Sequence, residues 1–396
     1  MLGKAKKVKS SKKKRKIAID AADLCYDRVD GTRIYIKNVL DKLGKYDKDN
    51  LYYIYLKGEL NPQLKFKIYP NYRIITSTFP FFWTQLKLPF LLFKDRPDIL
   101  WMPLQTVPFL KPKQTKFVVT IHDLAFKIFP RYFNLKDRIL LTLFSGLAIR
   151  RAYKIIAVSQ NTRKDIIRFY ERSPNDISVV YHGYKKELFN LENASNKDKV
   201  AEVKRKYKLK QDYILYAGAL QPRKNVTSLV KAFDRVKDYF AYDKKNKDIK
   251  LVIAGARAWL YKPIFEEVAR SKYRDEIIFT GHYKTRELPF LIGGSKIFVF
   301  PSFYEGFGIP VVEAMACAKP VICAKNSSLI EVGGDAVEFF DDRSYLNLSK
   351  KLIKLLKDED LMRELAKKGK SRAVDFSWRK TALETIKIFE QTLQDK

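Results

Sequence analysis

Short apolar segments alternate with amphipathic ones along nearly the whole chain, and this alternation limits the fold more than any other feature. The first apolar segment, Lys16-Ile-Ala-Ile-Asp20, ends in a carboxylate, and apolar residues at helical spacing follow Gly31. Further strands are predicted at 51–55, 73–76, 99–101, 117–121, 155–158 and 177–181, and helices at 135–152 and 161–170. Buried strands alternating with helices favour a parallel sheet covered on both faces.

The alternation stops at a polar stretch, residues 191–199, which we interpret as a linker, and then starts again. Strands are predicted at 213–217, 250–254, 277–280, 297–301, 320–323 and 337–339, and helices at 226–239, 263–271, 286–293 and 310–316. Three closing helices are predicted at 345–356, 360–373 and 378–393. The predicted fold class is α/β, with two Rossmann-like doubly wound units. Such sheets bind ligands at the carboxyl ends of their strands, so a ligand is expected between the units.

The chain is strongly basic, with 78 Lys and Arg against 44 Asp and Glu and a net charge of +34. A field of this sign attracts nucleotide diphosphates, anionic lipid surfaces or nucleic acid. A compositional bias toward Lys explains the charge equally well. Residues 1–15 form a basic tail that we expect to be flexible, because it has too little apolar surface to order itself.

The cysteines and the apolar segments exclude several classes of protein. The chain has three cysteines, Cys25, Cys317 and Cys323, and none of them forms a C-x-x-C motif. Because the number is odd and the spacing is absent, neither a disulfide framework nor a zinc ribbon is expected. No uninterrupted apolar run reaches the roughly 18–20 residues of a spanning helix. We therefore expect a cytoplasmic protein, either soluble or peripheral at the inner face of the membrane.

The most informative segment runs from Phe300 to Pro320. It leaves a predicted strand, turns through two glycines and enters a helix at Pro310, a residue that suits the first helical turn. Loop amides and a helix N-terminus together form an anion site. Glu305 and Glu313 are eight residues apart, and carboxylates accept hydrogen bonds from sugar diols. The segment is therefore a candidate site for a ligand with both phosphates and hydroxyls.

This segment resembles the E-x7-E signature of the retaining GT-B glycosyltransferases of glycosyltransferase family 4. The resemblance extends to the loop at Gly31 and to residues 120–124, 157–159, 216–225, 252–255, 279–281 and 327–332. Two departures occur: Asp30-Gly31-Thr32 stands where many members have two adjacent glycines, and Ala318 stands where a glycine is usual.

The resemblance implies a set of site residues. Arg223 and Lys224 would bind the donor diphosphate and stabilise the leaving group, and His122 would position the transferred sugar. Glu313 would bind the ribose, and Glu305 would recognise the donor sugar. The glycine-rich loops complete the expected donor site with Gly31, Gly218, Gly306, Phe307 and Gly308. His182 and His282 also follow strands, and we interpret both as structural.

The resemblance also implies a function and a domain order. We expect an acceptor-side domain at 16–188, a nucleotide-sugar domain at 189–375, and a final helix, 376–396, packed on the first. The reaction would be retaining hexosyl transfer to a glycan or lipid-linked acceptor, with no cofactor and no metal. GDP-mannose is the first expected donor and a UDP-hexose the second. Two segments mimic a metal-binding D-x-D motif, namely Asp47-Lys-Asp49 and Asp358-Glu-Asp360. We interpret both as surface or capping carboxylates.

Alternatives remain open. A basic nucleic-acid-binding protein would explain the charge, although no specific nucleic acid is expected, and a catalytically idle GT-B subunit would keep the fold. The aromatic segment 79–93 is the candidate for acceptor or membrane contact, with Trp83, Lys87, Phe90 and Lys94 as an interfacial stripe. The favoured interpretation of the same segment is a helix packed in the core.

Overall fold

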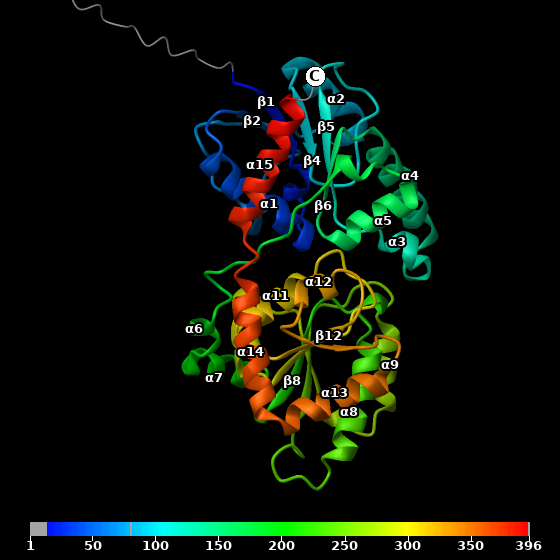
Figure 1. Ribbon diagram of the computed structural model, residues 1–396, viewed down its shortest axis with the longest axis vertical. Coiled ribbons are helices and arrows are strands. Elements are labelled where there is room, and N and C mark those ends of the chain that lie inside the picture. The colour runs from blue at the N-terminus through cyan, green and yellow to red at the C-terminus, as the bar shows by residue number, and fades with distance from the viewer. Residues whose placement is uncertain (1–13, 80, 395–396) are drawn as a thin grey trace, which may run out of the picture.

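The computed structural model describes residues 14–79 and 81–394, so most of the basic tail lies outside the described residues. Two sheets, one of seven strands and one of six, lie one above the other in Figure 1 with helices around each. Every strand pairing within the two sheets is parallel. The two doubly wound units predicted from the alternation are therefore present.

The first sheet has the order β3-β2-β1-β4-β5-β6-β7. Its strands are β1 (Lys16–Asp20), β2 (Leu51–Leu56), β3 (Tyr72–Thr76), β4 (Ile99–Met102), β5 (Lys116–Ile121), β6 (Lys154–Ala157) and β7 (Ile177–Val179). In β1, Ile17 and Ile19 contribute to one hydrophobic cluster and Ala18 to another, because successive side chains point to opposite faces. Burial on both faces explains why these strands are continuous apolar runs.

The helices around the first sheet are α1 (Gly31–Tyr46), α2 (Leu88–Asp95), α3 (Ala125–Ile128), α4 (Leu135–Arg151) and α5 (Gln160–Tyr170). Short 3-10 turns are η1 (Ala22–Cys25), η2 (Pro62–Leu64), η4 (Pro130–Tyr132) and η5 (Pro174–Asp176), and η3 (Trp83–Lys87) is a π-helix. Side-chain caps explain several starts: the side chains of Asp30, Asn134 and Ser159 accept a backbone N–H at the beginning of α1, α4 and α5.

The second sheet has the order β10-β9-β8-β11-β12-β13. Its strands are β8 (Tyr213–Ala217), β9 (Lys250–Ala254), β10 (Ile277–Gly281), β11 (Ile297–Phe300), β12 (Val321–Ala324) and β13 (Glu338–Phe340). Its helices are α6 (Leu191–Ala194), α7 (Lys197–Lys206), α8 (Val226–Tyr239), α9 (Lys262–Arg270), α10 (Leu288–Gly294), α11 (Ile309–Ala316), α12 (Leu329–Gly333), α13 (Tyr345–Lys357) and α14 (Glu359–Ala373), with turns η6 (Pro222–Lys224), η7 (Arg274–Glu276) and η8 (Thr285–Glu287).

The last helix, α15 (Trp378–Gln394), returns to the first sheet and lies beside α1 in Figure 1. The Phe389 ring is 5.8 Å from the Trp101 ring of β4, so residues nearly three hundred positions apart share one core. The segment that leaves the first domain and the segment that returns to it are in close contact. A Cβ at Gly183 would lie 2.1 Å from the Trp378 nitrogen. The domain boundaries at 188 and 375 stay a prediction.

Two local predictions are wrong. The expected linker at 191–199 forms α6 and the start of α7, because Asn190 and Asn196 cap the two helices and Ala194 is buried against α10. Gly31 does not lie in a loop but is the first residue of α1. The helix therefore begins where the sequence predicted an interruption.

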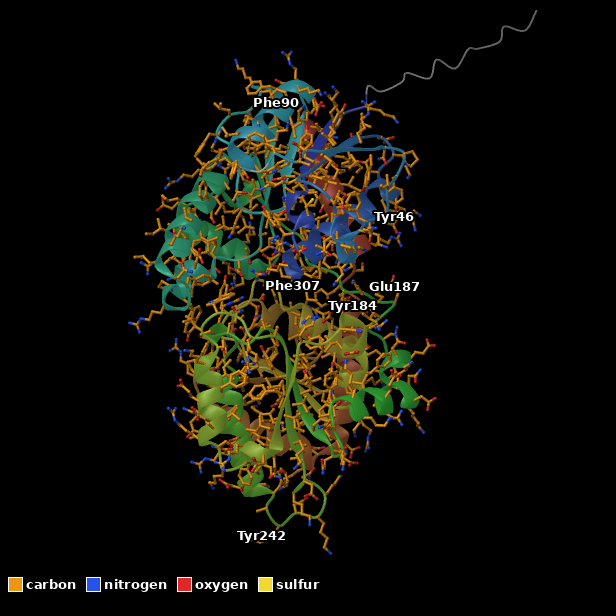
Figure 2. All side chains as sticks on the ribbon, turned by 180° about the vertical axis from the view of Figure 1, so that it is seen from behind. Tyr46, Phe90, Tyr184, Glu187, Tyr242 and Phe307 are labelled. Atoms are coloured by element: carbon orange, nitrogen blue, oxygen red, sulfur yellow. The ribbon has the colours of Figure 1, made fainter. Side chains whose placement is uncertain are left out.

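Each of the two interpretations of the aromatic segment 79–93 is correct for some of its residues. Trp83 is buried, and its indole N–H donates to Asp20, so the predicted interfacial stripe is wrong for this residue. Leu88, Leu91 and Leu92 are also buried in the first-domain core. Phe90, however, is 60% exposed and lies at the end of the molecule farthest from the second sheet (Figure 2). The segment is thus a core helix with an exposed aromatic side.

Candidate functional site

The second sheet places two cations and a carboxylate at the carboxyl ends of neighbouring strands. Arg223 and Lys224 lie in η6, which follows β8, and Glu305 follows β11. The strands β8 and β11 are hydrogen-bonded neighbours, with Ile297 opposite Ile214. Because the ends of adjacent parallel strands meet at one edge, residues 81 positions apart come together facing the first sheet.

These three side chains form an ion cluster. Lys224 Nζ lies 2.5 Å from Glu305 Oε1, and Arg223 Nη1 lies 3.4 Å from Glu305 Oε2. The side chains are only 10–13% exposed. Arg223 also donates to the Tyr304 carbonyl at 2.5 Å, and the Ser302 hydroxyl donates to Glu305 Oε1 at the same distance. The cluster is therefore enclosed and held in one geometry.

The cluster keeps its charges although it is buried. Burial alone would raise the pKa of Glu305, but Lys224 and Arg223 together hold it below its ordinary value. Burial lowers the pKa of Lys224, although Glu305 opposes this effect, and Asp123 is a second carboxylate near both cations. The Arg223 Nε is buried and lacks a hydrogen-bond partner among the described residues. An anionic ligand such as a diphosphate could accept a hydrogen bond from this nitrogen.

Backbone and hydroxyl contacts that the sequence analysis did not single out hold the loop of Glu305. The Ser328 hydroxyl contacts the carbonyls of Glu305 and Phe307 at 2.9 and 2.8 Å, and the Ser327 hydroxyl accepts from the Glu305 N–H at 3.0 Å. Both serines belong to the 327–332 segment that carries the family resemblance. That resemblance was the signal that could have identified them.

The two domains touch at His122 and Gly306. A Cβ at Gly306 would lie 1.9 Å from the His122 carbonyl oxygen, so only glycine permits this approach. His122 Nε2 lies 2.8 Å from the Pro103 carbonyl, and since a carbonyl only accepts, this nitrogen carries the proton. Burial lowers the pKa of His122 and favours the neutral ring. Its Nδ1 is then a hydrogen-bond acceptor, and the role of His122 in positioning a sugar stays a prediction.

The glycines after Glu305 shape the entry into α11. Gly308 has φ of 105° and precedes the first residue of the helix, a conformation that favours glycine. Phe307 packs its ring 5.1 Å from the His182 ring, which fixes the loop against the first domain. The loop amides and the start of α11 therefore face the junction between the sheets.

Glu313 lies on α11 and is half-buried. Burial raises the pKa of Glu313 to about 8, and the nearby Lys185 offsets only part of this effect. Among the described residues no hydrogen bond or ion pair to its carboxyl group is recorded. It lies apart from the Arg223–Glu305 cluster, consistent with contact to a different part of an extended ligand. Its assignment to a ribose stays a prediction.

Two other predicted glycines differ in their surroundings. Gly218 follows β8, and its carbonyl oxygen would be 1.8 Å from a Cβ at Gly255, so the loops after β8 and β9 are in close contact. Nothing lies within 4 Å of a Cβ at Gly31, which leaves room for a ligand there. Asp30 caps α1 beside it and pairs with Arg33.

The histidines and aspartates that we interpreted as structural differ in their surroundings. His182 is buried between Tyr35 and Phe307, with ring distances of 4.8 and 5.1 Å, whereas His282 is exposed at the end of β10. Asp47 is buried and accepts from Asn50 and Tyr52, and Asp358 caps α14. Over residues 14–79 and 81–394, no group of three or more His, Cys, Asp or Glu is arranged to hold a metal.

Further contacts join the domains. The Glu331 carboxylate accepts from the backbone N–H groups of Gln160 and Asn161 at 2.9 Å, at the start of α5 in the first domain. A carboxylate is favourable at a helix N-terminus. The Tyr304 hydroxyl donates to Asp165 at 2.6 Å, so the residue next to Glu305 is also anchored to α5.

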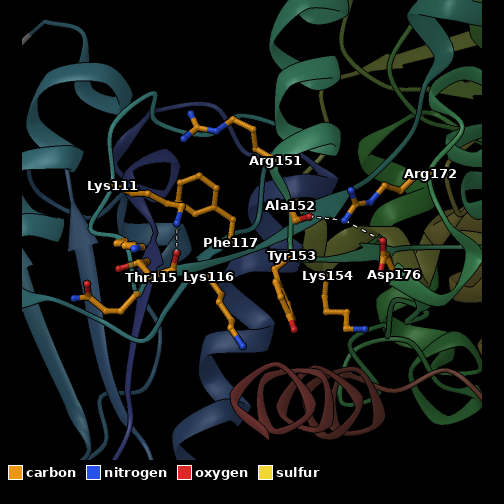
Figure 3. Close-up of a pocket in the computed structure, with 12 residues that line it drawn as sticks. Lys111, Thr115, Lys116, Phe117, Arg151, Ala152, Tyr153, Lys154, Arg172 and Asp176 are labelled. Carbon is orange, nitrogen blue, oxygen red and sulfur yellow. Dashed lines mark hydrogen bonds and ion pairs between the residues drawn. The ribbon is translucent and has the colours of Figure 1, made fainter. Parts of the chain in front are cut away.

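A separate cavity of about 560 Å³ lies at the amino ends of β5 and β6, on the edge of the first sheet away from the ion cluster (Figure 3). Lys111 and Arg151 are among the cations around it, and Arg172 pairs with Asp176 there. It does not belong to the site between the sheets. Within the described part of the chain, no helix is long and apolar enough to cross a membrane.

Comparison with known proteins agrees with this geometry. Residues 198–372 match the family described as glycosyl transferases group 1, and residues 47–188 match glycosyltransferase family 4. The chain is 30% identical over 285 residues to O-antigen chain mannosyltransferase B of Escherichia coli, covering 71% of this chain and 72% of that protein. It is 27% identical over 252 residues to the Escherichia coli mannosyltransferase WbdA, covering 62% of this chain but 29% of the length of WbdA.

Solved structures show the same architecture. Anabaena HepE in complex with UDP and glucose superposes with a TM-score of 0.71 at 16% identity, covering 95% of this chain and 100% of HepE. WaaG, a glycosyltransferase involved in lipopolysaccharide biosynthesis, gives 0.70 at 13% identity over 94% and 99%. The fold is that of the GT-B glycosyltransferases. The sequence relationships are more specific, and the chain belongs to glycosyltransferase family 4.

Proposed function

We propose that the protein transfers a mannosyl residue from GDP-mannose to a hydroxyl of a glycan or lipid-linked glycan, with retention of anomeric configuration. The ion cluster of Arg223, Lys224 and Glu305 is the observation that carries this proposal, because it offers two cations and a carboxylate in one enclosed place. The printed names of the relatives, several of which are mannosyltransferases, favour mannose over another hexose.

In the proposed reaction the bond between the sugar C1 and the donor phosphate oxygen breaks, and a bond forms between C1 and the acceptor oxygen on the same face. The acceptor proton passes to the departing phosphate oxygen. Arg223 and Lys224 stabilise the charge that develops on this phosphate. Glu305 and the neutral His122 hold the sugar. No metal is required in this scheme, because the two cations provide the positive charge.

A screen of donor hydrolysis tests the proposal. The protein is incubated with GDP-mannose, UDP-glucose and UDP-galactose, with and without EDTA, and release of the nucleoside diphosphate is measured. We expect the fastest release from GDP-mannose and no effect of EDTA. A preference for UDP-glucose would favour the second donor class, which the UDP and glucose in the HepE structure suggest. Release from none of the three would contradict the proposal.

We further propose that the enzyme works at an anionic membrane surface. Phe81, Phe82 and Phe90 are 69%, 74% and 60% exposed, and Lys87 lies with its Nζ 4.9 Å from the centre of the Phe90 ring. Exposed aromatic rings among cations suit the interface of a bilayer that contains anionic lipids. A lipid-linked acceptor would be reached there.

A further inference from the structure

The cavity of about 560 Å³ at the amino ends of β5 and β6 has a strongly basic lining (Figure 3). Its volume falls in the range of about 300–1,000 Å³ typical of small-molecule sites. The described residues of the lining include one carboxylate, Asp176, which already pairs with Arg172 at 3.0 Å. Against it stand six cations: Lys111, Lys113, Lys116, Arg151, Lys154 and Arg172. The lining therefore favours an anionic ligand.

Two of these cations, Lys111 and Arg151, lie beside the same aromatic ring. Lys111 Nζ is 5.4 Å and Arg151 Cζ is 5.5 Å from the centre of the Phe117 ring (Figure 3). Within the described part of the chain, neither side chain forms an ion pair with a carboxylate. Burial and the nearby charge of Arg151 lower the pKa of Lys111. A bound anion would offset the repulsion between the two cations.

The two cations are held in place and still have hydrogen bonds to offer. Lys111 Nζ donates to the Thr115 carbonyl at 2.6 Å, and Arg151 Nη1 donates to the Pro108 carbonyl at 2.9 Å. An ammonium has three N–H donors and a guanidinium five, so each group keeps donors for a ligand. Both side chains are half-buried and reach the surface. Phosphate oxygens accept such charge-assisted hydrogen bonds well, so the cavity suits a phosphate group.

Apolar surface borders the cavity on the side of Lys111. Phe109 and Leu110, the two residues before Lys111, are 54% and 63% exposed. A soluble phosphate has no apolar part that could contact such side chains. A lipid has both an anionic headgroup and apolar chains, and the combination of a basic cavity with an apolar rim therefore favours a lipid.

The rim is connected to the exposed aromatic side of residues 79–93. The Gln85 side chain, in η3, donates to the Val107 carbonyl at 3.2 Å and accepts from the Phe109 N–H at 2.8 Å. Arg151 contacts the same loop from the cavity, through the Pro108 carbonyl. The loop is thus attached to the aromatic segment on one side and to a cavity cation on the other.

We propose that this cavity binds the phosphate of an anionic membrane lipid, with Lys111 and Arg151 on the phosphate oxygens and Phe109 and Leu110 among the apolar chains. The inference rests on the membrane surface proposed above, and it adds a defined headgroup site at the end of the first sheet that points away from the cleft. The ligand class is a phosphate-bearing lipid rather than a donor or an acceptor of the transfer reaction.

Sedimentation with vesicles tests this inference on the full chain. The vesicles contain phosphatidylcholine and phosphatidylglycerol, and binding is measured at low salt and at about 0.15 M salt. At the higher salt the Debye length is about 8 Å, so exposed charges are largely screened and half-buried charges much less. The cavity variant Lys111→Gln/Arg151→Gln should bind about ten-fold more weakly than the unchanged protein at both salt concentrations.

A second variant guards against loss of local structure, because the cavity variant also loses two hydrogen bonds to backbone carbonyls. Lys113 is exposed on the lining, and its side chain has no hydrogen bond or ion pair in the described residues. Lys113→Glu therefore adds a negative charge at the cavity and leaves the fold intact. It should weaken vesicle binding in the same direction at both salt concentrations.

Two control variants remove the same charge elsewhere. Lys94→Gln/Arg96→Gln removes two exposed cations just before β4, at the same end of the sheet but outside the cavity, and should weaken binding at low salt only. Lys244→Gln/Lys247→Gln should have no effect at either salt concentration. These two lysines lie near Tyr242, which is 100% exposed at the far end of the second domain (Figure 2).

The outcomes separate the headgroup site from the other proposals. Equal vesicle binding by the unchanged protein and the cavity variant at the higher salt overturns the headgroup site and leaves the membrane surface standing. An equal loss in the cavity variant and in Lys94→Gln/Arg96→Gln at that salt overturns it too. Absence of vesicle binding by the unchanged protein overturns both. Hydrolysis of GDP-mannose should be the same in all variants, so the proposed transfer reaction is tested separately.

A soluble ligand is tested by calorimetry with glycerol phosphate, in the presence of GDP to fill the donor site. We expect weak binding that the cavity variant loses, together with its loss of vesicle binding. Binding of glycerol phosphate that the cavity variant loses while it sediments normally with vesicles would identify a soluble phosphate and overturn the lipid.

Discussion

The α-carbon of Gly306 in the second domain faces the carbonyl oxygen of His122 in the first so closely that a Cβ would lie 1.9 Å from it. Gly306 does not have a positive φ, so an alanine there is not strained in its own backbone. The effect of a substitution would therefore come from the contact between the domains and from the donor loop to which Gly306 belongs.

Gly306→Ala is expected to reduce turnover by ten-fold or more, because the domains must separate by about 1 Å and such a displacement can cost about 100-fold in rate. Thermal unfolding should change little. Steady-state hydrolysis of the donor measures the effect. Gly369→Ala is the comparison variant, since the three atoms nearest to its Cβ, at 3.2–3.4 Å, all belong to Met315 of the same domain. Equal loss in both variants would contradict the interpretation.

Arg223→Ala and Lys224→Ala should each reduce turnover by one or more orders of magnitude, because lost stabilisation of a leaving group is typically worth about 2–4 kcal/mol. Lys224→Ala should also lower the melting temperature, since it removes the closest cation from the buried Glu305 carboxylate. The double variant Lys224→Met/Glu305→Gln should recover stability but not turnover. Lys231→Ala breaks the more exposed ion pair with Glu267 and should change neither turnover nor the melting temperature.

The raised pKa of Glu313 predicts a pH-dependent stability. Between its ordinary value of 4.5 and about 8, the folded protein holds a proton on Glu313 that the unfolded chain has released. The contribution of this group to stability is therefore present at low pH and is lost as the pH rises toward 8. Melting temperatures should fall less over this range in Glu313→Gln than in the unchanged protein. Parallel curves would show that Glu313 titrates normally.

The same carboxyl group should link nucleotide binding to protons. If the ribose diol donates to the Glu313 carboxylate, binding below pH 8 must release a proton. Affinity for the nucleoside diphosphate should thus increase with pH between 6 and 8, and this increase should disappear in Glu313→Gln. Calorimetry at pH 7 in buffers of different ionisation enthalpy measures the released proton, and its absence would contradict the ribose assignment.

Binding to anionic vesicles should depend on the exposed aromatic side of residues 79–93. The variant Phe81→Ser/Phe90→Ser should sediment less with phosphatidylglycerol vesicles, whereas Tyr242→Ser should behave like the unchanged protein. Removal of Met1–Lys13 should weaken binding at low salt only, because exposed charges are screened at high salt. Equal sedimentation of all four proteins would contradict the membrane proposal.

The sequence predicted the strands well because most are short, buried apolar runs, although β3 and β10 are partly exposed. The bounds of β8 and β9 agree with the prediction to the residue, and each strand has at least four consecutive buried positions. The polar stretch at 191–199 was missed, because its helices depend on caps at Asn190 and Asn196 and on packing against α10. Neither local composition nor periodicity contains that information.

Site residues were predicted through motifs, but their pairing was not. The contact between Lys224 and Glu305 spans 81 positions and depends on β8 and β11 being neighbours in the sheet. Glu331 was named only within a resembling segment, and its capping of α5 requires the placement of two domains. Trp259, which follows β9, is in no motif. The hydrogen bond from its indole N–H to the Tyr132 carbonyl joins the two domains and could not be predicted from either alone.

The return of α15 to the first domain affects how the protein is made. A nascent chain emerges from the ribosome in order, so the first sheet is complete long before Phe389 can cover Trp101. At roughly 5–20 residues per second, synthesis from Val179 to Trp378 takes about 10–40 s. Throughout that interval the apolar surface destined for α15 is open to water, and one domain must wait for the other to be translated before its core can close.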